Sequence, residues 1–160
     1  MKKVLIALDY NSTAQKVAEQ GYALAKSMNA QITLLHVISD AAYYSSDIYS
    51  PLMGYDSFTD IKFIETASVE ELREAALDYL DKSQQHLNDT TIQTAVKEGD
   101  FGEQILETAT EINADIIVMG THSRRGLEKI LIGSVAEKVL RHSTIPLFII
   151  PTKTFEEKEK

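Results

Sequence analysis

The residues best suited to chemistry lie in a glycine-punctuated stretch of the C-terminal third. A short apolar run over 116–119 is rich in β-branched side chains and ends at Gly120. A polar loop follows, with hydroxyl, imidazole and guanidinium groups, and Gly133 and Ser134 then open an amphipathic segment over 135–141. A buried strand, a turn and a helix N-terminus together favour an anion site, because unpaired backbone N–H groups and the helix dipole converge there. Phosphate is the anion that this pattern indicates.

The stretch resembles the nucleotide loop of the universal stress protein family. That loop is Gly, two residues, Gly, nine residues, and then Gly with Ser or Thr. Here Gly120 fills the first position, Gly133 and Ser134 fill the last pair at the right spacing, and Ser123 replaces the middle glycine. The family uses glycine there for close approach to phosphate, whereas serine resists positive φ. The resemblance covers nearly the whole chain.

The resemblance implies an ATP-binding regulatory protein whose ligand is held by three parts of the chain. Asp9 is expected to bond the ribose hydroxyls or to help hold a metal ion, and a turn or capping aspartate is the alternative. Adenine is expected between the strand ends at Ala7, Leu8 and Val37. The other residues expected at the nucleotide are Met119, Gly120, Thr121, His122, Ser123, Arg125, Gly133, Ser134 and Val135. AMP and ADP are alternatives to ATP, and Mg²⁺ is a candidate companion of the nucleotide.

Alternating apolar segments predict the elements that position these residues. Apolar runs predict strands at 4–8, 31–37, 92–96, 116–119 and 147–150. Helical spacing predicts four helices: one after the N-cap candidates Asn11 and Ser12, one after a capping box that begins at Ser68, and two over 101–112 and 135–141. Strands that alternate with helices imply right-handed βαβ units and a parallel sheet. We therefore expect one α/β domain over residues 1–152, a doubly wound five-stranded parallel sheet with helices on both faces. The family resemblance adds the strand order 3-2-1-4-5.

Two segments do not fit this pattern. Residues 40–66 contain several aromatic side chains among Ser, Asp, Gly and Pro without a steady period, which indicates an irregular insertion. We expect it either to approach the nucleotide or a partner, or to be a surface loop. Residues 153–160 form a charged tail.

Composition restricts the classes of partner. The net charge of -8 disfavours nucleic acid and anionic membranes as partners. The absence of cysteine excludes disulfides and thiol catalysis. The apolar run that follows the first three residues is too short for a signal peptide, and no segment is long enough to span a membrane, so we expect a cytoplasmic protein.

Motifs for catalysis are lacking. The four histidines are scattered, and His36 is interpreted as a hydrogen-bonded core or face histidine within a strand. Neither a GxxxxGK loop nor a GxSxG elbow is found. We therefore expect nucleotide binding with at most slow hydrolysis. A nucleotide-independent dimeric stress protein and an enzyme acting on adenylated compounds are the alternatives. The resemblance also implies a homodimer paired through the last strand, whose apolar edge over 147–150 needs covering.

Overall fold

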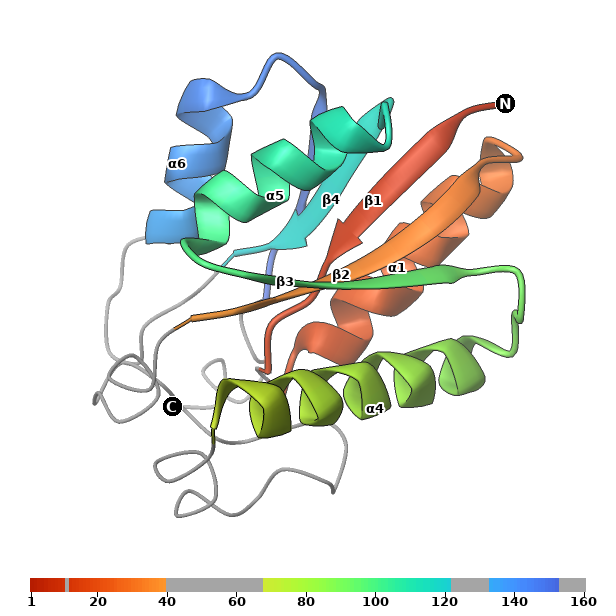
Figure 1. Ribbon diagram of the computed structural model, residues 1–160. Coiled ribbons are helices and arrows are strands. Elements are labelled where there is room, and N and C mark those ends of the chain that lie inside the picture. The colour runs from red at the N-terminus through yellow and green to blue at the C-terminus, as the bar shows by residue number, and fades with distance from the viewer. Residues whose placement is uncertain (11, 40–67, 122–132, 153–160) are drawn as a thin grey trace, which may run out of the picture.

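The computed structural model describes residues 1–10, 12–39, 68–121 and 133–152. Strands and helices alternate along this part of the chain (Figure 1). The elements are β1 (Lys3–Ala7), α1 (Ala14–Ser27), β2 (Gln31–Ile38), α4 (Val69–Leu87), β3 (Gln93–Glu98), α5 (Phe101–Glu111), β4 (Ile116–Gly120), α6 (Ser134–His142) and β5 (Leu147–Ile150). The predicted insertion at 40–66 and the predicted tail at 153–160 lie outside the described residues.

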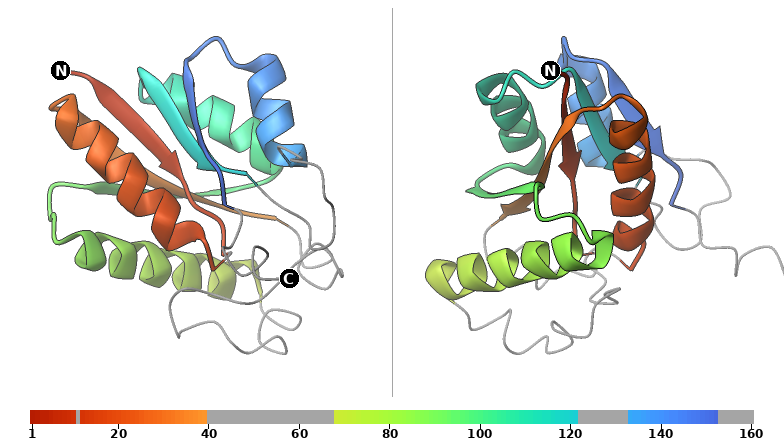
Figure 2. Two further views of the ribbon diagram at one scale, coloured as in Figure 1. Left: turned by 180° about the vertical axis from the view of Figure 1, so that it is seen from behind. Right: turned by 90° about the vertical axis from the view of Figure 1, so that its right-hand side faces the viewer.

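The described strands form one parallel sheet in the order β3-β2-β1-β4-β5. Helices α1 and α4 cover one face of the sheet, and α5 and α6 cover the other (Figures 1 and 2). The predicted doubly wound α/β fold and its strand order are therefore confirmed. The chain winds outward from β1 in one direction and then from β4 in the other, so the order reverses between these two strands.

Each face of the sheet has its own hydrophobic layer. Ile6, Leu34 and Val118 pack with residues of α1 and α4. Leu5 and Ile117 belong to the layer beneath α5 and α6. Because successive side chains of a strand point to opposite faces, a strand buried on both faces needs a continuous apolar run. This explains why the central strands could be predicted from short apolar runs.

Helix starts were predicted with mixed success. The capping box of α4 is present, with Ser68 accepting from the Glu71 N–H and the Glu71 side chain accepting from the Ser68 N–H. The N-cap of α1 is Thr13, so the prediction of Asn11 or Ser12 was wrong. Thr13 makes no side-chain capping bond and has helical dihedrals. The helix begins at Ala14, one or two residues later than an N-cap at Ser12 or Asn11 would place it.

None of the helices in the described part of the chain has the length and apolar character needed to cross a membrane.

Candidate functional site

The candidate site lies at the edge of the sheet where β1, β2 and β4 have their carboxyl ends. β1 pairs with β2 up to Ala7↔Leu35 and with β4 up to Ile6↔Val118. Asp9 therefore leaves the sheet between the ends of β2 and β4. In doubly wound sheets, ligands bind beyond the carboxyl ends at the point where the winding reverses. That point lies between β1 and β4 in this fold.

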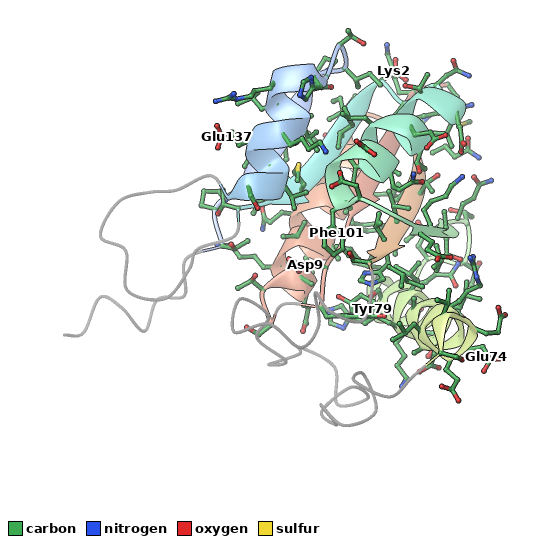
Figure 3. All side chains as sticks on the ribbon, turned by 60° about the vertical axis from the view of Figure 1, so that its left-hand side comes forward. Lys2, Asp9, Glu74, Tyr79, Phe101 and Glu137 are labelled. Carbon is green, nitrogen blue, oxygen red and sulfur yellow. The ribbon has the colours of Figure 1, made fainter. Side chains whose placement is uncertain are left out.

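The backbone leaving β1 is held by two buried side chains. The His36 imidazole donates from Nδ1 to the Leu8 carbonyl oxygen at 2.8 Å. The Tyr79 hydroxyl donates to the Asp9 carbonyl oxygen at 2.7 Å. Figure 3 shows Asp9 and Tyr79 at the same end of the molecule, with Lys2 at the opposite end. Asp9 itself is exposed, so its carboxylate lies at the surface of this edge.

Val37 presents backbone groups at the same edge. The Leu8 N–H donates to the Leu35 carbonyl at 2.8 Å, so Leu35 directs its backbone polar groups toward β1. These directions alternate along a strand, and the N–H and C=O of Val37 therefore also face the β1 side. Val37 lies beyond Ala7↔Leu35, the last paired residues of β1 and β2. One donor and one acceptor are thus directed past the end of β1.

The start of α6 supplies a further set of N–H groups. Gly133 is its N-cap, with φ 88° and ψ 152° and no side-chain capping bond. Non-glycine residues rarely adopt this backbone conformation, so the position requires glycine. The first N–H groups of a helix have no intrahelical partner and carry the positive end of its dipole. The N-terminal end of α6 lies beside the carboxyl end of β4 and the start of α5 (Figures 1 and 2).

Gly120 has a packing role. A Cβ atom on Gly120 would lie 2.7 Å from Thr152 Cγ2 and 2.8 Å from Val17 Cγ2. Thr121 is tied to the same segment, because its hydroxyl accepts from the Thr152 N–H at 3.0 Å and its carbonyl accepts from the Thr152 hydroxyl. These contacts connect the end of β4 to the chain after β5. They give Gly120 and Thr121 a structural explanation that does not require a ligand.

The remaining predicted site residues divide into two groups. Leu8, Val37 and Met119 are buried, and Ala7 and Val135 are half-buried, so their side chains belong mainly to the hydrophobic layers. His122, Ser123 and Arg125 lie outside the described residues. Tyr79 and Thr152 were not predicted from the sequence, and His36 was interpreted only as a hydrogen-bonded core or face histidine. A histidine at the end of a buried strand was the one available signal.

Metal ligands do not cluster in the part of the chain that the structure describes: it contains no group of three or more His, Asp or Glu side chains suited to hold an ion. Asp9 offers a carboxylate at the edge of the sheet. A carboxylate accepts hydrogen bonds and repels phosphate, so it suits sugar hydroxyls or a metal ion bound to phosphates better than phosphate itself.

The fold defines a class of protein: doubly wound α/β domains with a parallel sheet whose strand order reverses between β1 and β4. Comparison with known proteins then gives the family. A profile of the universal stress protein family matches residues 1–151, and the chain belongs to this family. It is 28% identical to universal stress protein MJ0577 of Methanocaldococcus jannaschii over 155 residues, covering 95% of this chain and 96% of that protein. It is 31% identical to the stress response protein NhaX of Bacillus subtilis, covering 92% and 96% of the two chains.

Solved structures agree with this assignment. The structure of MJ0577 superposes with a TM-score of 0.70 at 26% identity, covering 96% of this chain and 97% of that one. A universal stress protein in complex with cAMP has a TM-score of 0.59 at 21% identity, covering 95% and 98%. One from Archaeoglobus fulgidus in complex with dAMP has a TM-score of 0.59 at 17% identity, covering 94% and 98%. At these two lower identities the likeness concerns the fold.

Proposed function

We propose that this protein binds an adenine nucleotide beyond the carboxyl ends of β1, β2 and β4 and acts as a regulatory binding protein. The observation that carries the proposal is the convergence of three kinds of group at one edge of the sheet. These are the Asp9 carboxylate, the backbone N–H and C=O of Val37, and the uncapped start of α6 at Gly133.

Each group matches a different part of the ligand. Adenine presents an amine donor at N6 and an acceptor at N1, which are complementary to the C=O and N–H of Val37. Ribose hydroxyls are donors that suit the Asp9 carboxylate. Phosphate suits the N–H groups of Ser134 and Val135 at the start of α6. The cAMP and dAMP bound by two proteins of this fold are adenine nucleotides, which supports the same class of ligand here.

Binding, rather than turnover, is the expected basis of the function. A nucleotide that binds the folded protein stabilises the bound conformation by mass action. ATP is the preferred candidate, with Asp9 as the residue that would approach a Mg²⁺ ion carried by the triphosphate. We also expect the protein in the cytoplasm.

Calorimetry with AMP, ADP, ATP and cAMP, each with and without Mg²⁺, tests the proposal. Mass spectrometry of material released by denaturing the purified protein tests it without a choice of ligand. We expect at least one adenine nucleotide to bind in a one-to-one complex. An empty protein that binds none of the four would overturn the proposal.

Replacing Gly133 with Ala tests the phosphate contact. The strained φ of 88° is expected to shift the first turn of α6, and the affinity should fall by about tenfold or more. Gly99→Ala is the matched control, because Gly99 also has a positive φ, 137°, but follows the edge strand β3. We expect both variants to lose stability and only Gly133→Ala to lose affinity. If Gly133→Ala binds the nucleotide as tightly as Gly99→Ala and the native protein do, the start of α6 is not the phosphate site.

A nucleotide-independent homodimer is the second candidate. Ser123 in the place of the middle loop glycine favours the loss of nucleotide binding. Phe148 on the edge strand β5, which is 40% exposed, favours a dimer in either case. Ser123→Gly measured beside the native protein separates the two functions. If the native protein fails to bind a nucleotide and the variant binds one, Ser123 prevents nucleotide binding in the native protein.

A further inference from the structure

Three aromatic rings meet beneath the point where the chain leaves β1. The rings of Tyr10 and His36 have centroids 4.0 Å apart, and Tyr79 packs edge-on against Tyr10 at 5.1 Å. His36 comes from β2 and Tyr79 from α4, and both are buried, with exposed fractions of 2% and 1%. The polar atoms of these two side chains hold two successive carbonyl groups, those of Leu8 and Asp9.

The hydrogen bond from His36 occupies the place where the β1–β2 ladder would continue. The last ladder bond runs from the Leu8 N–H to the Leu35 carbonyl. In a parallel ladder the following bond would run from the Val37 N–H to the Leu8 carbonyl. That carbonyl instead accepts from His36 Nδ1 at 2.8 Å. The imidazole thus replaces a backbone donor, and the paired part of the two strands ends there.

The hydrogen bond to the Leu8 carbonyl also determines the tautomer of the His36 imidazole. A carbonyl oxygen only accepts hydrogen bonds, so Nδ1 carries the hydrogen and Nε2 keeps its lone pair. Nε2 is buried and has no hydrogen-bond partner among the described residues. A proton on Nε2 would therefore be buried without an acceptor, and burial lowers the pKa of His36 to about 4. The ring is neutral at neutral pH.

We propose that His36 and Tyr79 are positioning residues for the nucleotide, an inference that rests on the proposed function. His36 ends the ladder, so that the Val37 N–H stays directed at the base. Tyr79 fixes the Asp9 carbonyl, and with it the direction in which the Asp9 carboxylate leaves the sheet. Neither side chain touches the ligand. Their effect on affinity passes through the backbone of residues 8 and 9.

Three variants test the two residues by calorimetry with AMP and with IMP, whose base has a donor at N1 and lacks the N6 amine. His36→Leu removes the donor, and the Val37 N–H is then free to bond the Leu8 carbonyl. We expect an affinity for AMP about tenfold lower and a smaller preference for AMP over IMP. His36→Asn places an amide donor where Nδ1 stood, so most of the affinity and the preference should return. Tyr79→Phe removes only a hydroxyl, and we expect a loss of severalfold for both nucleotides.

Ser83→Ala is the matched control for Tyr79→Phe. Ser83 is also buried on α4, and its hydroxyl donates to the Tyr79 carbonyl at 3.1 Å. Ser83→Ala removes one hydroxyl from the same helix without freeing the Asp9 carbonyl. The affinity of this variant for AMP should therefore equal that of the native protein.

The outcomes distinguish this inference from the function on which it rests. If the native protein binds AMP and both His36→Leu and Tyr79→Phe bind it equally well with the same preference over IMP, the positioning roles are wrong while the function stands. If the native protein binds no adenine nucleotide, both fail. Nitrogen NMR of the ligand-free protein gives an independent result: a hydrogen on Nε2 of His36 in place of Nδ1 would overturn the inference whatever the affinities. If His36→Leu fails to fold, Tyr79→Phe and its control Ser83→Ala still test the positioning role of Tyr79.

Discussion

At the scale of single residues, His36 connects the packing of the sheet to the edge where the nucleotide is proposed to bind. Its side chain is fully enclosed between β2 and α4, yet it bonds a backbone group 28 residues earlier in the chain. A buried histidine in such a place resists protonation, because the charged form loses its hydration. This gives the fold a measurable dependence on pH.

The free energy of unfolding should fall in mild acid because of His36. Burial lowers its pKa from 6.5 to about 4 in the folded protein, while the bond to Leu8 and the charge of Asp9 act in the opposite direction. Between these two values the unfolded chain binds a proton that the folded chain does not. The contribution of His36 to the free energy of unfolding is therefore complete above pH 6.5. It is lost as the pH falls toward about 4, and the loss is on the order of 3 kcal/mol. Urea unfolding across this range measures it.

His36→Asn is the control for this dependence, since asparagine keeps a donor and does not titrate. The carboxyl groups and the other three histidines are present in both proteins, so the difference between the two curves reports the titration of His36. Parallel curves would show that the imidazole is protonated as easily in the folded protein as in the unfolded one.

The two loop glycines show what could and could not be predicted from single residues. Gly133 was expected to open a helix, and its φ of 88° explains why glycine stands there. Gly120 was expected in the nucleotide loop, and that stays a prediction. Its close approach to Val17 and Thr152 arises from packing between distant segments. No local pattern contains that information. The same holds for the bonds from His36 to Leu8 and from Tyr79 to Asp9.

At the scale of elements, Asp100 joins the two helices on one face of the sheet. It caps α5 by accepting from the Glu103 N–H at 3.0 Å, and it also accepts from Lys138 of α6 at 2.9 Å. The hydrogen bond from Lys138 is the largest cause that lowers the pKa of Asp100. Asp100 therefore connects the start of α5 to the middle of α6.

Replacing Asp100 with Ala should cost about 1–2 kcal/mol of stability, because α5 loses its cap and Lys138 loses a partner. Asp100→Asn keeps a capping oxygen without the charge and should cost less. Chemical unfolding of both variants measures the difference. Ser68→Ala is the comparison, because Ser68 caps α4 through its reciprocal bonds with Glu71 and has no cationic partner in the described part of the chain. A loss for Asp100→Ala that does not exceed the loss for Asp100→Asn would show that the cap has no energetic role.

Helix starts differ in how well the sequence reveals them. The capping box of Ser68 and Glu71 is local, with partners three residues apart, so it could be predicted. Thr13, the N-cap of α1, makes no side-chain capping bond, so no capping motif marks the start of this helix in the sequence. The pairing of Asp100 with Lys138 links residues 38 apart and could not be predicted.

At the scale of the whole molecule, the alternation of apolar runs with amphipathic segments predicted a parallel sheet with helices on both faces. Periodicity alone did not give the strand order, which came from the family resemblance. The order matters for the proposed function, because it places Asp9 next to the end of β4 although more than a hundred residues separate them. The individual contacts at that edge required the structure.

The edge strand β5 leads to the last prediction, a homodimer. Among the described strands β5 pairs with β4 alone, which leaves it at the edge of the sheet, and its Phe148 is 40% exposed. Pairing with β5 of a second copy would cover both. Phe148→Lys should therefore convert a dimer to a monomer in sedimentation equilibrium. Leu77→Lys, on α4 and 41% exposed, should leave the dimer intact. A native protein that stays monomeric at micromolar concentrations, or equal effects of the two lysines, would contradict pairing through β5.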